Sequence, residues 1–222
     1  MGKTKNQNSR DGTSEQSRFR YTARMKYTAD AIKRLCIVRR NTFEFGKKVI
    51  MAVCAIAMIV IGLLMSGSNG TAIVLMPVGC IALTGLNAKA RGLADQIIKS
   101  YDGKEYPHLQ YFFSDSGITT NEVSEECPYS RIVALVEDNE YLYLFQNKLA
   151  AFMIDRETIK GGTDGFKSFM EKKTGLEFCE PFNILKFNLK TFKRYLEFTQ
   201  AAKAANGDGY QGERLGRKSW MR

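Results

Sequence analysis

The chain has 222 residues and a formal net charge of +10, a length that suits one domain plus a membrane anchor. Its mean hydropathy of −0.27 excludes a polytopic transporter. The charge is uneven: residues 1–48 carry 13 basic and 4 acidic side chains, residues 87–181 carry 11 and 16, and residues 182–222 carry 9 and 3. Basic arms therefore flank an acidic middle, and the basic total does not by itself indicate one acidic partner.

The cysteine and histidine content argues against disulfides and metal sites. Five cysteines are scattered along the chain without a CxxC pair: Cys36, Cys54, Cys80, Cys127 and Cys179. An odd, scattered set is typical of reducing surroundings. Because His108 is the only histidine, a zinc site of the usual Cys/His spacing lacks ligands. We expect no metal and no cofactor.

The chain begins with a polar segment, residues 1–18, which we expect to be a disordered arm. Residues 19–48 are predicted to form a cytosolic strand and a basic helix. Apolar and polar residues alternate over Phe19–Thr28, which predicts a strand. Asp30 is a helix-start signal, and Ala31–Arg40 is predicted to be helical.

Basic side chains around this helix are the candidate contacts for anionic lipid headgroups: Lys33, Arg34, Arg39, Arg40, Lys47 and Lys48. The helix either lies on the membrane surface through these residues or packs on the folded domain with a solvated basic edge. Both alternatives are open, because a position close to the membrane suits either one.

Residues 49–86 contain no Asp, Glu, Lys or Arg. They comprise two apolar runs, Val49–Met65 and Thr71–Leu86, joined by five small polar residues, and they predict a transmembrane helical hairpin. Crossing about 30 Å of hydrocarbon takes about 20 helical residues, so each run needs a short extension. Small residues would allow close approach of the two helices: Ala52, Ala55, Gly62, Gly79 and Gly85.

The orientation follows from the basic residues at the two ends of the hairpin. Thirteen precede the first run, Lys89 and Arg91 follow the second, and the connecting loop has none. The positive-inside rule therefore predicts two spans with both termini in the cytoplasm. Since Phe19–Thr28 then lies on the same side as the residues after the hairpin, we predict that it pairs with or packs on the later sheet.

Residues 87–181 are predicted to form a cytosolic domain. Ala88–Tyr101 is expected to be a helix that leaves the bilayer. Short strands at hairpin spacing follow: Leu109–Ser114, Gly117–Glu122, Tyr129–Glu137, Glu140–Gln146 and Leu149–Asp155. A helix over Gly165–Thr174, with Asp164 as its N-cap, closes the set. The fold class is therefore α+β, with one small antiparallel sheet or partly open barrel.

The remaining residues extend the domain. Residues 182–205 interleave aromatic and basic residues and predict a basic amphipathic helix, with Asn188–Ala205 helical. Residues 206–222 are rich in glycine and basic residues, and we expect a disordered tail. Aromatic and basic residues in this pattern also occur in single-strand binders. An anchored protein more often uses them on lipid or on itself, so we expect no nucleic acid.

Several stretches resemble the YcxB-like family of bacterial membrane proteins. They include Tyr111-Phe112-Phe113 through Gly117-Ile118, then Tyr129–Ile132, and further stretches after them: Tyr141–Leu144, Ala150–Arg156 and Phe166–Phe169. The order of elements before them, over most of residues 20–175, is also similar. The resemblance implies a pleckstrin-homology-like (PH-like) domain on the cytosolic face of a bacterial plasma membrane, in a family without an established activity. Residues 182–222 have no counterpart in it.

No catalytic signature is present. A GxxxxGK[ST] loop, a GxSxG elbow and an HExxH motif are all missing. His108 lies beside Pro107 at a strand entry, and the acidic pairs Glu125-Glu126 and Glu137-Asp138 fall at strand edges, where solvated carboxylates are common. We therefore expect no enzyme.

Two binding functions are left. The first is a membrane-held module that binds a protein or peptide, which the acidic middle favours. The second is a lipid sensor or organiser that uses its basic arms on anionic lipid. A homo-oligomer is compatible with either.

Overall fold

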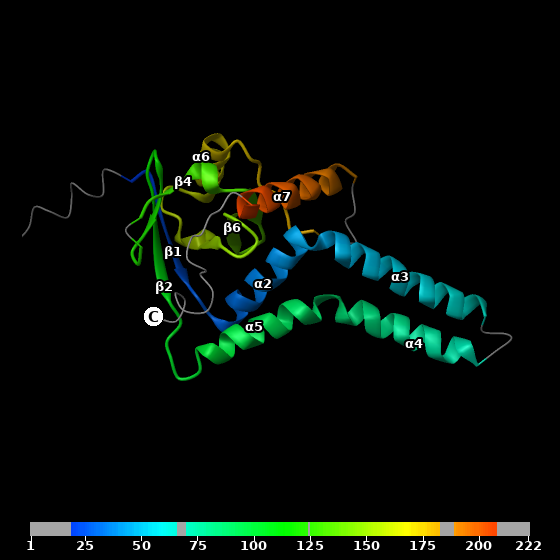
Figure 1. Cartoon of the computed structure of the whole chain (residues 1–222). Coiled ribbons are helices and arrows are strands. Elements are labelled where there is room, and N and C mark those ends of the chain that lie inside the picture. Colours follow the sequence, from blue (N-terminus) through cyan, green and yellow to red (C-terminus); the bar gives the residue numbers. More distant parts are fainter. Residues whose placement is uncertain (1–18, 66–69, 124, 183–188, 208–222) are drawn as a thin grey trace, which may run out of the picture.

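The computed structural model describes residues 19–65, 70–123, 125–182 and 189–207, and shows two antiparallel sheets with helices around them and a long helical arm (Figure 1). The predicted α+β class is confirmed. The predicted arm 1–18 and most of the predicted tail 206–222 lie outside the described residues.

The first sheet joins the N-terminal strand to residues that follow the hairpin. Its order is β1 (Tyr21–Lys26), β2 (His108–Phe113), β3 (Gly117–Thr120) and β4 (Cys127–Pro128). Strand β1 runs antiparallel to β2, with Tyr21 opposite Phe113. Alternate residues Ala23 and Met25 are buried, as the period of two predicts. The predicted pairing of the N-terminal segment with the later sheet is confirmed.

The second sheet contains β5 (Ala134–Glu137), β6 (Tyr141–Phe145) and β7 (Ala151–Asp155) in that order. The prediction of a single sheet is therefore wrong. The predicted strand Tyr129–Glu137 is divided: a 3-10 turn η2 (Tyr129–Arg131) ends at the change of sheet. The Tyr129 hydroxyl donates to the Ser114 carbonyl oxygen at 2.7 Å, which ties this turn to the first sheet, whereas Ala134 pairs with Phe145 in the second.

The two sheets meet along β1. Strand β1 lies beside β7 and the 3-10 turn η3 (Arg156–Thr158). The Thr158 Oγ1 accepts from the Arg24 amide at 2.9 Å and donates to the Arg24 carbonyl at 2.8 Å. At the far edge, Val136 bridges to Cys179. In the described part of the chain no continuous ladder closes the sheets into a barrel.

The helices of the domain cover these sheets. Helix α2 (Ala29–Phe43) begins earlier than predicted, because Thr28 rather than Asp30 caps it: the Thr28 Oγ1 accepts from the Ala31 amide at 3.2 Å. Helix α5 (Ala88–Ser100) packs on α2, close to its predicted bounds. Helix α7 (Leu189–Gly207) also contacts α2.

Helix α6 (Thr163–Thr174) buries Phe166 and Met170 completely. The Phe166 ring packs edge-on against Phe113 at 4.7 Å, which joins α6 to the first sheet. The predicted N-cap at Asp164 is wrong. Gly162 occupies the cap with φ of +89°, and no side chain hydrogen-bonds there. A glycine reaches this conformation without strain, so the turn into the helix is set by the backbone.

The arm consists of α3 (Phe45–Leu64) and α4 (Thr71–Thr84), followed by the 3-10 turn η1 (Gly85–Asn87) and α5 (Figure 1). The helices touch at Gly62 and Gly79: a Cβ added to Gly79 would lie 2.8 Å from the Ala55 carbonyl oxygen. Ala52 and Ala55 are buried. Gly85, predicted with them as a contact residue, has nothing within 4 Å of its Cβ position.

Candidate membrane-facing site

The base of the arm is where the charge-free segment joins the domain. On one side α2 passes into α3 with only Glu44 between them, and on the other α4 passes through η1 into α5. The chain bends between α2 and α3 and again between α4 and α5 (Figure 1). The segment that follows α6 also reaches this region, so three parts of the chain meet here.

An open pocket of about 470 Å³ lies between these three parts. It is lined from α2 and α3, from α4 and η1, and from the segment before α7: Asn41, Lys48, Leu83, Thr84, Leu86, Asn87, Glu180, Pro181 and Phe182. Its wall is therefore mixed, with apolar residues from the hairpin and polar residues from the domain side.

Lys48 is the central cation of this pocket. It is the last charged residue before the apolar run, and it is only 8% exposed. Its Nζ donates to Asn41 Oδ1 at 2.8 Å and to Asn87 Oδ1 at 3.1 Å, so the side chain links α2 to η1 across the base of the arm. Both partners are neutral, and no carboxylate among the described residues forms an ion pair with it.

Arg40 is a second buried cation in the same region, also 8% exposed. Its Nε lies 3.9 Å from Glu44 Oε2. Its buried Nε and Nη1 make no hydrogen bond within the part of the chain that the structure describes. Arg40 interacts electrostatically with Lys48. Two like charges thus share a poorly solvated region, which makes it favourable for an anion.

The other predicted headgroup contacts differ in their surroundings. Lys33 and Lys47 are exposed, and Arg39 is half-buried. Arg34 pairs with Glu140 at 2.6 Å and lies over the Tyr141 ring, which fixes α2 to strand β6. Helix α2 is therefore packed on the domain, with Lys33 on its open edge.

An aromatic cluster holds α7 against the start of α3. Phe45 contacts the rings of Phe182 and Tyr195 at 5.5 and 5.6 Å, and Phe198 packs on Tyr195. No sequence pattern indicates that Phe45 belongs to this cluster rather than to the apolar run that follows it. Asn41 and Asn87 were also missed as site residues, since their shared partner depends on how the hairpin folds back.

The residues considered for catalysis have structural roles. Glu137 pairs with Lys167 at 2.7 Å and with Arg156 at 3.5 Å. Glu126 accepts from the hydroxyls of Ser114 and Ser116. His108 is exposed on the first strand residue of β2. Among the described residues no group of three or more His, Cys, Asp or Glu side chains is placed to hold a metal ion.

The cysteines outside the arm are buried. Burial raises the pKa of the Cys127 thiol, and raises that of Cys179 to about 11. A thiol in such surroundings is a poor nucleophile near neutral pH. All five cysteines are free, as their scattered positions predict.

Helix α3 is the one helix in the described part of the chain that is long and apolar enough to cross a membrane, with a mean hydropathy of 2.3. Only 22% of the most apolar stretch of this helix is buried by the rest of the protein. Length and composition alone are weak support for membrane association, because buried helices of soluble proteins share both properties.

Comparison with known proteins supports the family resemblance. Residues 113–170, from the end of β2 into α6, match the family model of the YcxB-like protein. The chain thus carries a YcxB-like segment, and the resemblance is confirmed over that range, about a quarter of the sequence. No curated protein and no solved structure matches the chain.

Proposed function

We infer that the protein is an integral membrane protein whose two-span hairpin holds a PH-like domain at the cytosolic face of a bacterial plasma membrane, where the domain binds a protein or peptide. The supporting observation is the contrast between the arm and its base. Large apolar side chains of α3 and α4 are exposed, whereas the base gathers polar and basic groups.

The exposed side chains of the arm suit hydrocarbon. Leu64 is 82% exposed and Ile81 is 69% exposed, and several others are 45% to 65% exposed: Ile50, Val53, Ile56, Val60, Ile61, Val74 and Val78. An apolar surface that surrounds two packed helices is unusual for contact with water and typical of a membrane span.

The lengths are compatible with two spans. Helix α3 has 20 residues, or about 30 Å of rise. Helix α4 has 14 residues and continues into η1, which together give about 27 Å. Both arms therefore approach the thickness of a bilayer core, and the basic residues before α3 and after η1 favour a cytosolic base.

A PH-like domain is the finer interpretation of the two sheets. The sheets meet along β1, and α6 contacts the first sheet through Phe166 on Phe113 and the second through Lys167 on Glu137, as in a partly open barrel. The edge of β5 is partly occupied by the bridge from Val136 to Cys179, which favours side-chain surfaces over strand addition there as the means of binding. The domain's acidic balance favours a basic protein or peptide over anionic lipid.

Membrane integration is tested by alkaline carbonate extraction of the full-length protein. The wild type is expected to stay in the membrane pellet. Val53→Arg, at a site 60% exposed on α3, is expected to lose integration because an arginine near a span centre costs about 3 kcal/mol. Leu149→Arg, at a 78% exposed turn of the domain, is the matched control. Release of the wild type by carbonate contradicts the proposal.

The topology is tested with a membrane-impermeant maleimide on intact cells. Gly70→Cys at the tip of the arm is expected to react from outside, because nothing lies within 4 Å of its Cβ position. Leu149→Cys is expected to react only after the cells are permeabilised. Equal labelling of both variants in intact cells would exclude two spans with a cytosolic domain.

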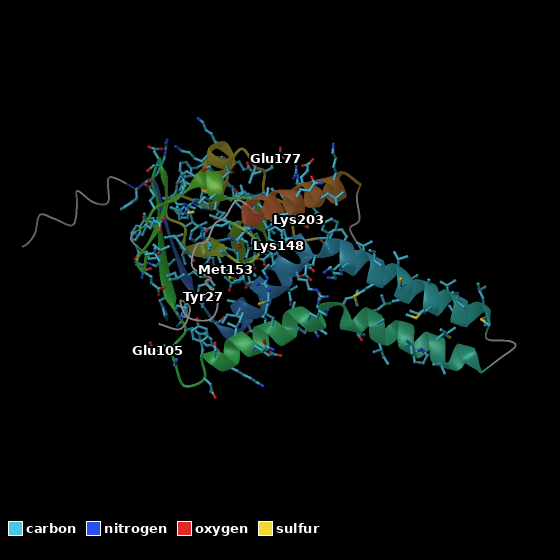
Figure 2. All side chains as sticks on the ribbon, viewed as in Figure 1. Tyr27, Glu105, Lys148, Met153, Glu177 and Lys203 are labelled. Atoms are coloured by element: carbon cyan, nitrogen blue, oxygen red, sulfur yellow. The ribbon has the colours of Figure 1, made fainter. Side chains whose placement is uncertain are left out.

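The interaction is tested by crosslinking in native membranes. Asp102, Glu105 and Glu122 are exposed acidic residues near the end of α5 and the first sheet; Glu105 lies on the side of the domain away from the arm (Figure 2). Changing all three to amides is expected to abolish a reproducible protein crosslink, whereas Glu157→Gln retains it. Crosslinks to lipid alone would favour the lipid sensor.

The lipid sensor is the second candidate, and the exposed Lys33 and Lys47 beside the base favour it. Changing both to glutamine would then weaken association of the solubilised protein with vesicles that contain phosphatidylglycerol. Binding without catalysis is part of both proposals. Turnover lost on His108→Ala would contradict them.

A further inference from the structure

We propose that the pocket at the base of the arm is a binding site for a phosphate group, as carried by a phospholipid headgroup or by a free phosphate compound, with Lys48 as its main ligand. The lipid source rests on the membrane insertion proposed above. The sequence placed Lys48 among six candidate headgroup contacts, and the structure adds that Lys48 is buried in a defined pocket.

The first argument is the unbalanced charge of Lys48. An ammonium group carries three donors, and two of them reach the neutral oxygens of Asn41 and Asn87. A buried cation is costly unless an anion and full hydrogen bonding compensate it. A phosphate oxygen in the pocket would accept a hydrogen bond from the third donor and would supply the missing counter-charge.

The second argument is Arg40, which adds positive potential from within the protein. It is as buried as Lys48, and its nearest carboxylate lies at 3.9 Å with poor hydrogen-bond contact. Its Nε and Nη1 have no hydrogen-bond partner among the described residues. Arg40 does not line the pocket, so its contribution is the field at the site rather than a ligand contact.

The third argument is depth. Lys48 precedes a run of 38 residues without a charge, and Leu83 and Leu86 also line the pocket. If the arm is inserted, the pocket lies at the level of the headgroups, where phosphates are most concentrated. The wall would then contact the glycerol and upper acyl region through leucines and the phosphate through Lys48.

Glu180 also lines the pocket and is exposed, so its charge opposes an anion there less than a buried carboxylate would.

The test is native mass spectrometry of the full-length protein in detergent with added phosphatidylglycerol. One lipid is expected to be retained by the wild type, and Lys48→Met is expected to weaken retention about ten-fold, which corresponds to one charge-assisted hydrogen bond. Lys47→Met removes the same charge at the neighbouring exposed position and is expected to change retention less than about two-fold. Equal effects of the two variants, or none, overturn the proposal.

A second variant separates binding from folding. Asn41→Asp places a carboxylate where the amide oxygen lies 2.8 Å from Lys48, so the protein itself supplies the counter-charge. Its thermal stability is expected to be kept or raised while lipid retention falls. A purely structural Lys48 predicts no loss of retention in this variant, and that result would also overturn the proposal.

A third arm identifies the source of the phosphate. If glycerol 3-phosphate displaces the retained lipid from the wild type, the site takes free phosphate compounds; if it does not, the site requires the lipid. Normal carbonate resistance with no effect of Lys48→Met would remove this inference and leave the proposed function intact.

Discussion

Lys26 lies opposite His108 in the antiparallel ladder between β1 and β2, although residues 27–107, which include the whole arm, separate them. The arm is thus inserted into the first sheet rather than attached to one end of the domain. Helix α2 connects the arm to β1, and α5 leads from the arm toward β2.

This arrangement predicts that β1 is essential for the domain. Met25 is 1% exposed beneath the sheet, so Met25→Gln buries an amide without a partner and is expected to cost roughly 3 kcal/mol of unfolding free energy. Arg24→Gln changes the neighbouring exposed residue and is expected to have little effect. Thermal unfolding of the purified protein measures both. A domain that tolerates Met25→Gln as well as Arg24→Gln would contradict a shared core.

The packing of the arm depends on Gly79. A methyl group there would meet Ile59 Cγ1 at 2.6 Å and the Ala55 carbonyl at 2.8 Å, and a backbone oxygen cannot move without displacing its helix. We expect Gly79→Ala to lower the free energy of unfolding of the arm by roughly 1–3 kcal/mol, and with it the melting temperature. Gly85→Ala, in open space one turn and a half further on, is the control. Equal melting of the two variants would show that the helices do not pack closely at Gly79.

The parts predicted from sequence alone are those with a local signal. The charge-free stretch identified both helices of the arm, because a long apolar run without a charge favours a helix. Alternation identified β1, and turn residues identified β6 and β7. The N-cap of α2 could not be chosen from the sequence, because Thr28 and Asp30 are both residue types that favour this position. In the structure Thr28 has the extended backbone of an N-cap, with φ of −135°.

The parts that were missed depend on contacts between distant residues. The sequence of a buried strand does not indicate which sheet the strand joins. The division between Tyr129 and Ala134 is visible only in the structure, where the Tyr129 hydroxyl bonds to Ser114 in the first sheet. Likewise, Lys48 and Asn87 come together only because the arm folds back on itself. The family resemblance indicated the order of elements but not the pocket.

The acidic pair Glu137-Asp138 supplies a third prediction. The Glu137 carboxylate is 18% exposed and accepts from Lys167 at 2.7 Å, so Lys167→Met is expected to cost about 1–2 kcal/mol, because it weakens a partly buried charge pair. Lys173→Met breaks an ion pair with Asp115, which is 74% exposed, and is expected to cost less stability than Lys167→Met. Chemical denaturation compares them. A larger loss for Lys173→Met would show that burial does not decide the strength of these pairs.

High pH is expected to destabilise the domain. Burial raises the pKa of Tyr27 from 10.0 to about 12 and that of Cys179 from 9.0 to about 11, because a phenolate or thiolate is poorly solvated inside the protein. Both groups are neutral when protonated, and their stabilising effect is complete below the unfolded pKa values. As pH rises above about 9, the unfolded chain releases protons that the folded chain keeps, and the free energy of unfolding falls until about pH 12.

Apparent melting temperatures between about pH 8 and about pH 11 test this expectation. Near the lower end of this range both groups are protonated in the folded and the unfolded chain, so their titration should not change the melting temperature. At the alkaline end the melting temperature should fall. Tyr27→Phe removes one of the titrating groups while keeping the ring, so its melting temperature is expected to fall less steeply over the same range. If the variant and the wild type lose stability in parallel, Tyr27 does not keep its proton in the folded protein, and its phenol must be reachable by solvent.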